Sequence, residues 1–501
     1  MDGHRVFVLS GGDIYRINTE SGEKTLVATV TDSDSAAEFF FYREALYLID
    51  GSNLFTVDDN GISEPHGYVP LVGKDWSDNQ VGEPYEARNL ITPRARISYI
   101  ISDPPSTVLK TGASVASIEA VYINDALIDA SNYAISSSPS IISVRNLSAG
   151  DRVTVHLTYT AEADAAESLK KNTRAAVFGG VNSTRPFLWG GENSAMMYCT
   201  GYVSEESLKS ARIGHPDSDA LYFPAGNEFT VGDGRYPITG VGRHYDRLLI
   251  FTEGGAWMAE SETCGTEEFP VMKINSTVLT HSHGATAMLG NDPITVGADS
   301  VYRWSADTDE LDECNAHSIS RPIDPLIRDT FLKNGGIFSD VIHNELLLYS
   351  PDCYGVVWVY SVSEGCWSRF DGIYADGFIR FENGVGFYHG QDVFLFDDAL
   401  TSDEGSKEII AYFWGNPTDF GTSAKKRLTA LEISSSGGEL TAQMSLDGEA
   451  TPSVTADMDT APTEAAVRRR LTSKRFNSLR VKITAPSQQK QRIHSLCIMI
   501  R

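Results

Sequence analysis

Two histidines one residue apart, His281 and His283, are the sequence feature with the clearest potential for metal chemistry. On a β-strand, residues i and i+2 point to the same side, so both imidazoles could face one ion. A zinc site also needs a third ligand, and the surrounding sequence offers none at a diagnostic spacing. We therefore expect ordinary strand histidines here and no metal site.

Catalytic motifs with a fixed spacing are absent from the sequence. It contains no G-x-x-x-x-G-K-[ST], G-x-S-x-G or H-E-x-x-H pattern, which removes local support for phosphate-cradling, nucleophile-elbow and zinc-protease chemistry. Glycosidases need two converging carboxylates, and although the chain has 67 Asp and Glu, no pair stands out by position. The sequence predicts a protein that is not an enzyme, with no catalytic residue and no cofactor.

Length and charge narrow the class of protein further. The 501 residues suggest two to four domains, and 41% hydrophobic residues indicate a folded chain. The formal net charge of −26 disfavours binding of nucleic acid by charge, because phosphate contacts need a basic footprint.

No apolar stretch approaches the roughly 18 residues of a membrane span, and the N-terminus does not resemble a signal peptide. We expect synthesis in the cytoplasm, with the chain staying there until a larger assembly forms.

The six cysteines are scattered without a C-x-x-C pair. In a chain of this length, such spacing favours buried thiols over a disulfide framework or a zinc site.

A repeated strand pair is the strongest structural pattern. Each copy has an apolar strand, a turn with Gly, Asn or Asp, and a second strand ending in aromatic or aliphatic residues, as at 45–57 and 247–258. Further copies occur at 5–17, 175–189, 293–304, 345–360 and 384–396. Spacings of roughly 35–50 residues are typical of propeller blades, about six or seven of them. The alternative is a β-sandwich with repetitive hairpins.

The repeats divide the chain into four predicted segments of an all-β protein. Residues 1–87 would form the first propeller blades and 163–404 the remaining blades. Residues 88–162 alternate without the blade rhythm and predict an inserted small β-sandwich, followed by a short helix at 162–171. Residues 405–501 predict a separate C-terminal β-sandwich.

Basic clusters set this C-terminal segment apart. It holds 14 Lys and Arg against 9 Asp and Glu, about +5, whereas the remaining residues carry about −31. The clusters are Lys425, Lys426 and Arg427, and Arg468, Arg469 and Arg470 with Lys474 and Arg475. Two interpretations stay open: a solvated face, or an interface that docks against an acidic neighbour such as an adjacent copy.

Three stretches in this order resemble a family of tailed-phage virion proteins, the tail-nozzle and packaged-DNA-stabilisation type. They are NLITPR at 89–94 with YIND at 122–125, DALYFP at 219–224 continued to 257, and WGNPTDFG at 414–421 followed by KKRL at 425–428. The resemblance implies a β-propeller in a ring of about six copies that extends the DNA channel below the portal and adaptor complex. It brings no catalytic residues with it.

The expected function is therefore structural: a virion tail component that holds packaged DNA, guides its ejection and contacts double-stranded DNA without reading its sequence. A lining with little positive charge suits this role, because few counterions are released when DNA touches it. Two alternatives stay open. One is a receptor- or glycan-binding propeller, possibly glycan-cleaving, at the tail tip. The other is a structural role elsewhere in the tail.

Overall fold

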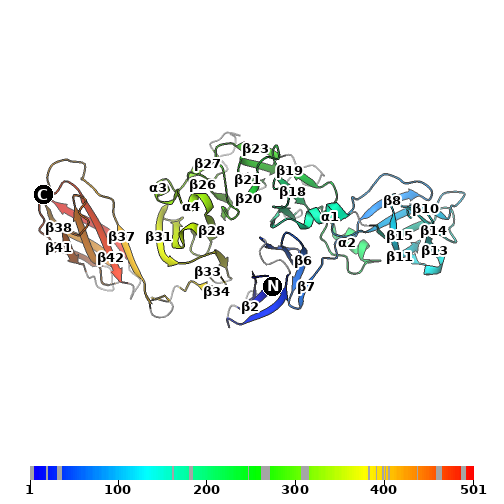
Figure 1. Ribbon diagram of the computed structural model, residues 1–501, viewed down its shortest axis with the longest axis horizontal. Helices are drawn as coiled ribbons and strands as arrows, with labels where there is room; N and C mark the ends of the chain where they lie inside the picture. Colours follow the sequence, from blue (N-terminus) through cyan, green and yellow to red (C-terminus); the bar gives the residue numbers. More distant parts are fainter. Residues whose placement is uncertain are drawn as a thin grey trace. The chain divides into compact units, whose positions relative to one another are not determined.

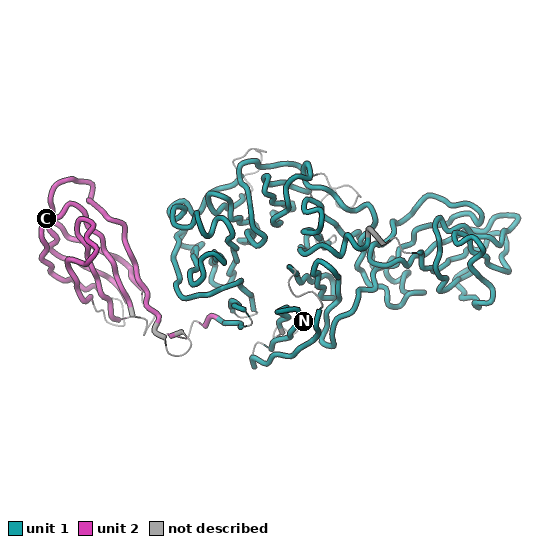
Figure 2. The backbone as a smooth tube through the Cα atoms, viewed as in Figure 1, with its two compact units in different colours: residues 1–395 teal, residues 396–501 magenta. Residues whose placement is uncertain are grey.

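In a computed structural model, 52% of the residues lie in strands and 6% in helices, which confirms the all-β prediction. The structure describes residues 5–18, 21–30, 36–160, 163–179, 184–245, 247–260, 271–305, 315–381, 384–390, 392–397, 400, 402–403, 407–436, 438–458, 465–486 and 492–501. The chain forms two compact units, Met1–Leu395 and Phe396–Arg501 (Figure 2). No helix in the described ranges is long and apolar enough to cross a membrane.

Unit 1 contains seven meander sheets among its described residues, here called sheets 1–7, in which antiparallel strands follow chain order (Figure 1). Sheets 1–3 are β1 (Arg5–Ser10), β2 (Asp13–Asn18) and β3 (Lys24–Thr29); β4 (Glu38–Tyr42), β5 (Ala45–Ile49), β6 (Leu54–Asp58) and β7 (Gly61–Ser63); and β16 (Arg174–Phe178), β17 (Arg185–Trp189), β18 (Met196–Cys199) and β19 (Glu228–Thr230).

Sheets 4–7 continue the pattern. They are β20 (Ile238–His244), β21 (Arg247–Thr252), β22 (Gly255–Glu260) and β23 (Val271–Asn275); β24 (Thr286–Leu289), β25 (Asp292–Val296), β26 (Val301–Trp304) and β27 (Ala316–Ser318); β28 (Gly336–Asp340), β29 (Glu345–Tyr349), β30 (Gly355–Ser361) and β31 (Cys366–Ile373); and β32 (Gly377–Arg380), β33 (Val385–His389) and β34 (Asp392–Leu395). All seven hairpins expected from the repeats are present.

Each meander sheet packs against the next one along the chain. Ile14 and Leu48 share a core between sheets 1 and 2, and separate hydrophobic clusters join sheets 2 and 3, 3 and 4, 4 and 5, and 5 and 6. Phe338 and Phe378 stack at 5.7 Å between sheets 6 and 7. A meander sheet has two faces to cover, and stacking covers the faces between neighbours. No sheet closes on itself among the described residues.

Short helices fill the connections. They are α1 (Ala163–Lys170), α2 (Glu205–Arg212), α3 (Asp324–Ile327), α4 (Phe331–Asn334) and the 3-10 turns at Ala130–Asn132 and Pro351–Cys353. Helix α1 confirms the helix expected after the inserted domain. Ser204 caps α2 by accepting a hydrogen bond from the Ser207 amide.

The inserted domain is a sandwich of two sheets around its own core. One sheet, in the order β12-β11-β15-β9-β8, comprises β8 (Leu71–Ser77), β9 (Arg94–Ile100), β11 (Val115–Ile123), β12 (Ala126–Leu127) and β15 (Arg152–Tyr159). The other comprises β10 (Val108–Lys110), β14 (Ile141–Val144) and β13 (Tyr133–Ile135).

This sandwich begins at β8, before its expected start at residue 88. Strand β8 pairs in parallel with β9, which local sequence could not reveal. Trp76 on β8 is buried in the sandwich core, and its ring packs directly against Gly73 and Gly82. A Cβ atom would lie only 2.5 Å from the ring at residue 73 and 2.6 Å at residue 82. The two glycines make room for the indole.

Unit 2 is a second sandwich with its own core. One sheet has the order β37-β42-β39-β40, with β37 (Ile410–Trp414), β42 (Leu479–Pro486), β39 (Thr441–Leu446) and β40 (Val454–Asp457). The other has the order β41-β38-β43, with β41 (Ala465–Arg470), β38 (Leu428–Ser436) and β43 (Arg492–Ile500). A small ladder, β35 (Ser402–Asp403) and β36 (Lys407–Glu408), precedes them. The strands of this sandwich all lie within residues 405–501, the segment predicted from its basic charge and from the alternation of apolar and polar residues.

The expectation of buried thiols is wrong for part of the set. Cys199 is buried, but Cys353 is only half-buried and Cys366 and Cys497 are exposed, all four as free thiols. Cys366 begins β31 and Cys497 lies on β43, two strands whose residues are largely exposed. Cys264 and Cys314 lie outside the described residues.

Candidate functional site

Two of the stretches singled out in the sequence, NLITPR at 89–94 and DALYFP at 219–224, meet where the inserted sandwich joins the meander sheets. The buried Asn89 side chain donates to the carbonyls of Tyr68 (2.9 Å) and Leu221 (3.0 Å). Its Oδ1 accepts from the amides of Ile91 (3.2 Å) and Phe223 (3.0 Å). One amide group thus ties together segments about 130 residues apart in sequence. We call this region, defined by residues 66–69, 86–96, 119–122, 156–158 and 210–224, the junction.

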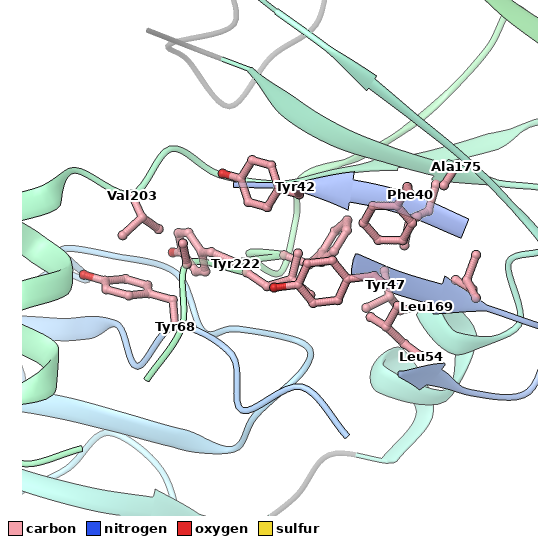
Figure 3. Close-up of a cluster of buried hydrophobic side chains, with 14 of the residues drawn as sticks. Phe40, Tyr42, Tyr47, Leu54, Tyr68, Leu169, Ala175, Val203 and Tyr222 are labelled. Carbon is pink, nitrogen blue, oxygen red and sulfur yellow. The ribbon is translucent and has the colours of Figure 1, made fainter. Parts of the chain in front are cut away.

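A hydrophobic core lies beneath the junction. Tyr68 and Tyr222 pack edge to face at 5.2 Å, within a cluster that also contains Phe40 and Tyr47 of sheet 2 (Figure 3). Leu169 of α1 and Ala175 of sheet 3 belong to the same cluster. The junction is therefore fixed to the sheets on both sides of the insertion in the sequence.

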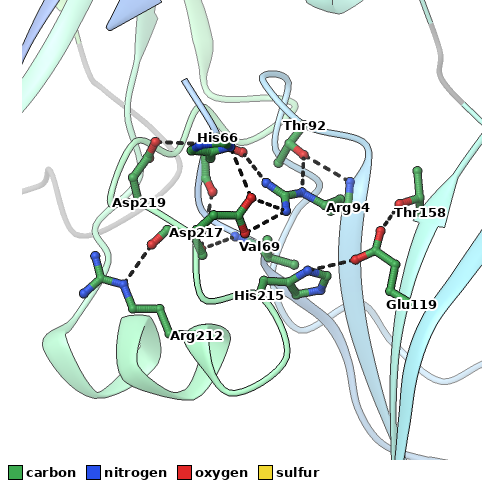
Figure 4. A network of polar contacts seen from close by, with 12 residues as sticks. His66, Val69, Thr92, Arg94, Glu119, Thr158, Arg212, His215, Asp217 and Asp219 are labelled. Atoms are coloured by element: carbon green, nitrogen blue, oxygen red, sulfur yellow. Dashed lines mark hydrogen bonds and ion pairs between the residues drawn. The ribbon is translucent and has the colours of Figure 1, made fainter. Parts of the chain in front are cut away.

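Charged groups surround the entry of the chain into β9 (Figure 4). Arg94 donates from one guanidinium nitrogen to both Asp217 oxygens at 2.9 Å and from another to the His66 carbonyl at 3.2 Å. Burial alone would raise the pKa of Asp217, but the hydrogen bond and charge of Arg94 hold that pKa below its usual value. Asp219 accepts from the amides of Gly67 and Leu221, and burial raises its pKa.

Arg96, two residues further on the same face of β9, is buried. Its guanidinium donates to the Val69 carbonyl (3.1 Å), Ser210 Oγ on α2 (2.9 Å) and the Tyr68 hydroxyl (3.3 Å). The Tyr68 hydroxyl lies 3.1 Å from both Glu86 carboxylate oxygens. Burial raises the pKa of Glu86, and the hydrogen bonds to it and the charge of Arg96 oppose that rise. The buried Arg96 and the half-buried Glu86 are thus linked through the hydroxyl group of Tyr68.

Two buried histidines complete the junction. The ring centroids of His156 on β15 and His215 after α2 lie 4.9 Å apart, and Tyr122 packs edge to face against His156 at 5.3 Å. His215 Nδ1 lies 2.9 Å from the Glu119 carboxylate, as Figure 4 shows. Among the described residues, His156 Nδ1 and His215 Nε2 have no hydrogen-bond partner. Burial, followed by the charge of His215, lowers the pKa of His156 to about 3.

Gly214 allows this ring packing. A Cβ at residue 214 would lie 2.3 Å from His156 Nδ1, so a side chain there must displace the buried imidazole. We expect Gly214→Ala to lower the free energy of unfolding by about 1–3 kcal/mol, measured by urea denaturation. Gly384→Ala is the matched control, because its added methyl group would meet no atom within 4 Å. Equal stability of the two variants would contradict the tight packing.

The basic residues that are clustered in the sequence of unit 2 have different environments in the structure. Lys426 is buried, and its Nζ donates to the carbonyls of Thr422, Ala424 and Asn477. Arg469 Nε donates to the Asp457 carbonyl (2.9 Å), which joins the two sheets of unit 2, and Lys474 pairs with Glu449. The remaining predicted interface residues are exposed on unit 2: Lys425, Arg427, Arg468, Arg470 and Arg475.

The sequence reasoning missed Arg96, His156 and His215. Strand β9 carries Arg94, Arg96 and Ser98 on alternate positions, between the buried Ala95, Ile97 and Tyr99. This alternation resembles a solvated face, but α2 and the segment before β8 cover it. Only their packing turns these polar side chains into a buried network.

The histidine pair that suggested a metal site lies outside a strand. His281 and His283 occupy a turn before β24, which corrects the expectation of strand histidines. Within the described ranges, no group of three or more His, Cys, Asp or Glu side chains could hold a metal ion.

A polar cleft of about 370 Å³ lies beside β26 and β27. Asp299, Tyr302, His317, Arg321 and Asp324 are among its lining residues. The Tyr302 hydroxyl donates to Asp299 at 2.8 Å; burial and then this hydrogen bond raise the pKa of Tyr302 to about 12. The cleft therefore presents both acidic and basic side chains that can form hydrogen bonds.

Comparison with known proteins assigns no family. No family model and no curated protein matches the chain. Among solved structures, PorZ of Porphyromonas gingivalis, a surface component of the type-IX secretion system, aligns at a TM-score of 0.34 and 11% identity, over 79% of this chain and 37% of that one. BamB from Moraxella catarrhalis aligns at a TM-score of 0.32 and 11% identity, over 78% of this chain and 80% of the BamB chain. At these scores neither likeness identifies a fold or an activity.

Proposed function

We propose that this protein is a ring-forming structural component of a phage tail, which extends the DNA channel below the portal and adaptor. The observation that carries the proposal is the junction: two sequence stretches that resemble tail-nozzle proteins, far apart in the chain, form one hydrogen-bonded unit around Asn89. Two of the three stretches that carry the resemblance therefore contribute to one structural element, whereas the third, at 414–428, belongs to unit 2.

The proposed architecture is a β-propeller whose blades are sheets 1–7. Two observations favour it: each sheet is a meander in chain order, and each shares a hydrophobic core with the next. Closing such a series into a ring leaves few unprotected strand edges. The inserted sandwich and unit 2 are then modules attached to the propeller.

The net charge of −26 suits a wall along which DNA moves. Double-stranded DNA gains affinity for a protein by releasing counterions as cations approach its phosphates. A wall of stiff, acidic β-modules releases few counterions, so DNA slides past without being held.

Mass photometry of the purified chain tests the proposal, alone and with the portal and adaptor proteins encoded beside it. We expect closed rings of about six copies, either spontaneously or on the adaptor. A chain that stays monomeric with those partners under all conditions would exclude the ring function.

The exposed cations of β41 provide a further test of assembly. We expect Arg468→Glu with Arg470→Glu to weaken ring formation several-fold, and more strongly at low ionic strength, because rim charges act mainly through screened, long-range attraction. Arg469 stays unchanged in this variant because it holds the two sheets of unit 2 together. The readout is the concentration at which rings form in mass photometry, and no change would show that these residues form only a solvated face.

The polar cleft favours glycan binding as a second candidate. Its carboxylates, phenol, imidazole and guanidinium can bind sugar hydroxyls, and its volume is within the range of ligand pockets. A glycan array with the wild-type chain and a Tyr302→Phe/Arg321→Ala variant distinguishes the two functions. Binding lost in that variant, by a chain that never forms rings, would support the second candidate.

A further inference from the structure

Large exposed side chains line edge strand β37 of the sheet β37-β42-β39-β40 in unit 2, with Phe413 (53% exposed) on one face and three others on the opposite face. Ile410, Tyr412 and Trp414 alternate along edge strand β37 and are 57%, 46% and 54% exposed. Trp414 pairs with Lys482 of β42, and Arg480 lies two residues before Lys482 on the same face. We call Ile410, Tyr412, Trp414, Arg480 and Lys482 the aromatic-cationic face.

The cations of this face rest on its aromatic rings. The Arg480 guanidinium lies 4.0 Å from the Trp414 ring centroid, and Lys482 Nζ lies 5.2 Å from Tyr412 and 5.6 Å from Trp414. In the described part of the chain, neither cation forms an ion pair with a carboxylate. Two uncompensated charges are thus held in place over an apolar surface.

This composition is typical of the centre of a protein interface. Trp, Tyr and Arg dominate binding hot spots, because they combine a large apolar contact area with polar or charged groups. An edge strand also presents unpaired backbone groups, and the outer edge of β37 has no neighbouring strand among the described residues. An edge left apolar in this way is an aggregation hazard unless a partner covers it.

We propose that the aromatic-cationic face docks onto the acidic unit 1 of a second copy of this chain. Charge complementarity identifies the occupant: residues 405–501 carry about +5, and the rest of the chain carries about −31. Carboxylates of the neighbouring copy neutralise Arg480 and Lys482 while its apolar side chains cover the rings. This inference rests on the proposed ring function and names the surface that closes the ring.

The geometry disfavours two other occupants. A sugar stacks flat on an exposed ring, but Arg480 already covers a face of Trp414 at 4.0 Å. A nucleic acid needs a track of cations along its phosphates, whereas this face holds two on a chain of net charge −26.

Two full-length variants test the face. Tyr412→Ala/Trp414→Ala removes the rings, and Arg480→Glu/Lys482→Glu reverses the charges. Arg492→Glu/Arg501→Glu is the matched control, because it makes the same charge change at exposed sites on the other sheet. We expect both face variants to raise the concentration needed for assembly about tenfold or more in mass photometry, and the control to raise it several-fold at most, because the control changes only the long-range attraction. Thermal unfolding of each variant verifies that it folds.

Cross-linking identifies the surface that the face contacts. Zero-length amine–carboxyl coupling on an equal mixture of light and ¹⁵N-labelled chains should join Lys482 to unit 1 carboxylates in mixed-isotope pairs. Intermolecular links should be about half mixed-isotope pairs, so a complete absence of mixed pairs would show that the face binds its own unit 1, and would overturn the inference. Face variants that assemble like the wild type would also overturn it and leave the ring function intact. A wild type that never assembles would instead refute the ring function itself.

Discussion

Arg96→Met is expected to lower the free energy of unfolding by about 2–4 kcal/mol, because it removes a buried guanidinium that is hydrogen-bonded to Tyr68 and leaves the half-buried Glu86 without the positive charge that opposes its desolvation. The substitution also removes the donors to Val69 and to Ser210 on α2. Urea denaturation measures the loss. Hydrogen exchange should show faster opening at both β9 and α2, because the guanidinium bridges them.

The double variant Arg96→Met/Glu86→Gln separates the charge effect from packing. A neutral amide in place of Glu86 removes the unpaired charge, so part of the lost stability should return. Losses that simply add would contradict the coupling through Tyr68. The matched surface change Arg475→Met, at an exposed site, should alter stability by less than about 0.5 kcal/mol.

Acidification is expected to open the junction, with His156 as a main contributor. Its pKa is about 3 in the folded chain and 6.5 in the unfolded one. Above about pH 6.5 both states are neutral here, so the full stability is present. Between about pH 6.5 and about pH 3, His156 is protonated in the unfolded state but stays neutral in the folded state. Stability therefore falls by up to about 1.4 kcal/mol per pH unit across this window.

Three groups beside His156 affect its pKa. His215 and Arg96 add positive charge beside it, and Glu119 is the nearby carboxylate that opposes them. Glu119, although burial would raise its pKa, has a lowered pKa through its hydrogen bonds with His215 and Thr158. A depressed carboxyl pKa also contributes stability that is lost as pH falls through it.

Hydrogen exchange at β11 and β15, measured from about pH 7 to about pH 4 and corrected for the intrinsic rate, tests this expectation. His156→Phe keeps an aromatic ring at this position but removes the titratable group. The opening free energy should therefore fall less steeply as the pH is lowered, by a slope that corresponds to about one proton. His281→Gln, at an exposed turn, should leave the slope unchanged. An unaltered slope in His156→Phe would mean that other groups control the acid response.

The all-β class, the seven hairpins and helix α1 followed from the sequence alone. These features depend on local periodicity: residues alternate by two along a strand, and glycine supplies the left-handed backbone of tight turns, as Gly51 does between β5 and β6 with φ of 85°. The charge contrast of 405–501 is likewise a property of composition.

Tertiary structure alone decided what the polar residues do. Lys426 and Arg469 belong to one basic cluster each in the sequence, yet one is buried among carbonyls and the other bridges two sheets. Arg96 and His156 lie on alternating positions typical of solvated strands, and packing against α2 and its following turn buries them. Local spacing fixes which side of its own element a residue faces. Whether water or another element covers that side depends on contacts between distant segments, such as those around Asn89.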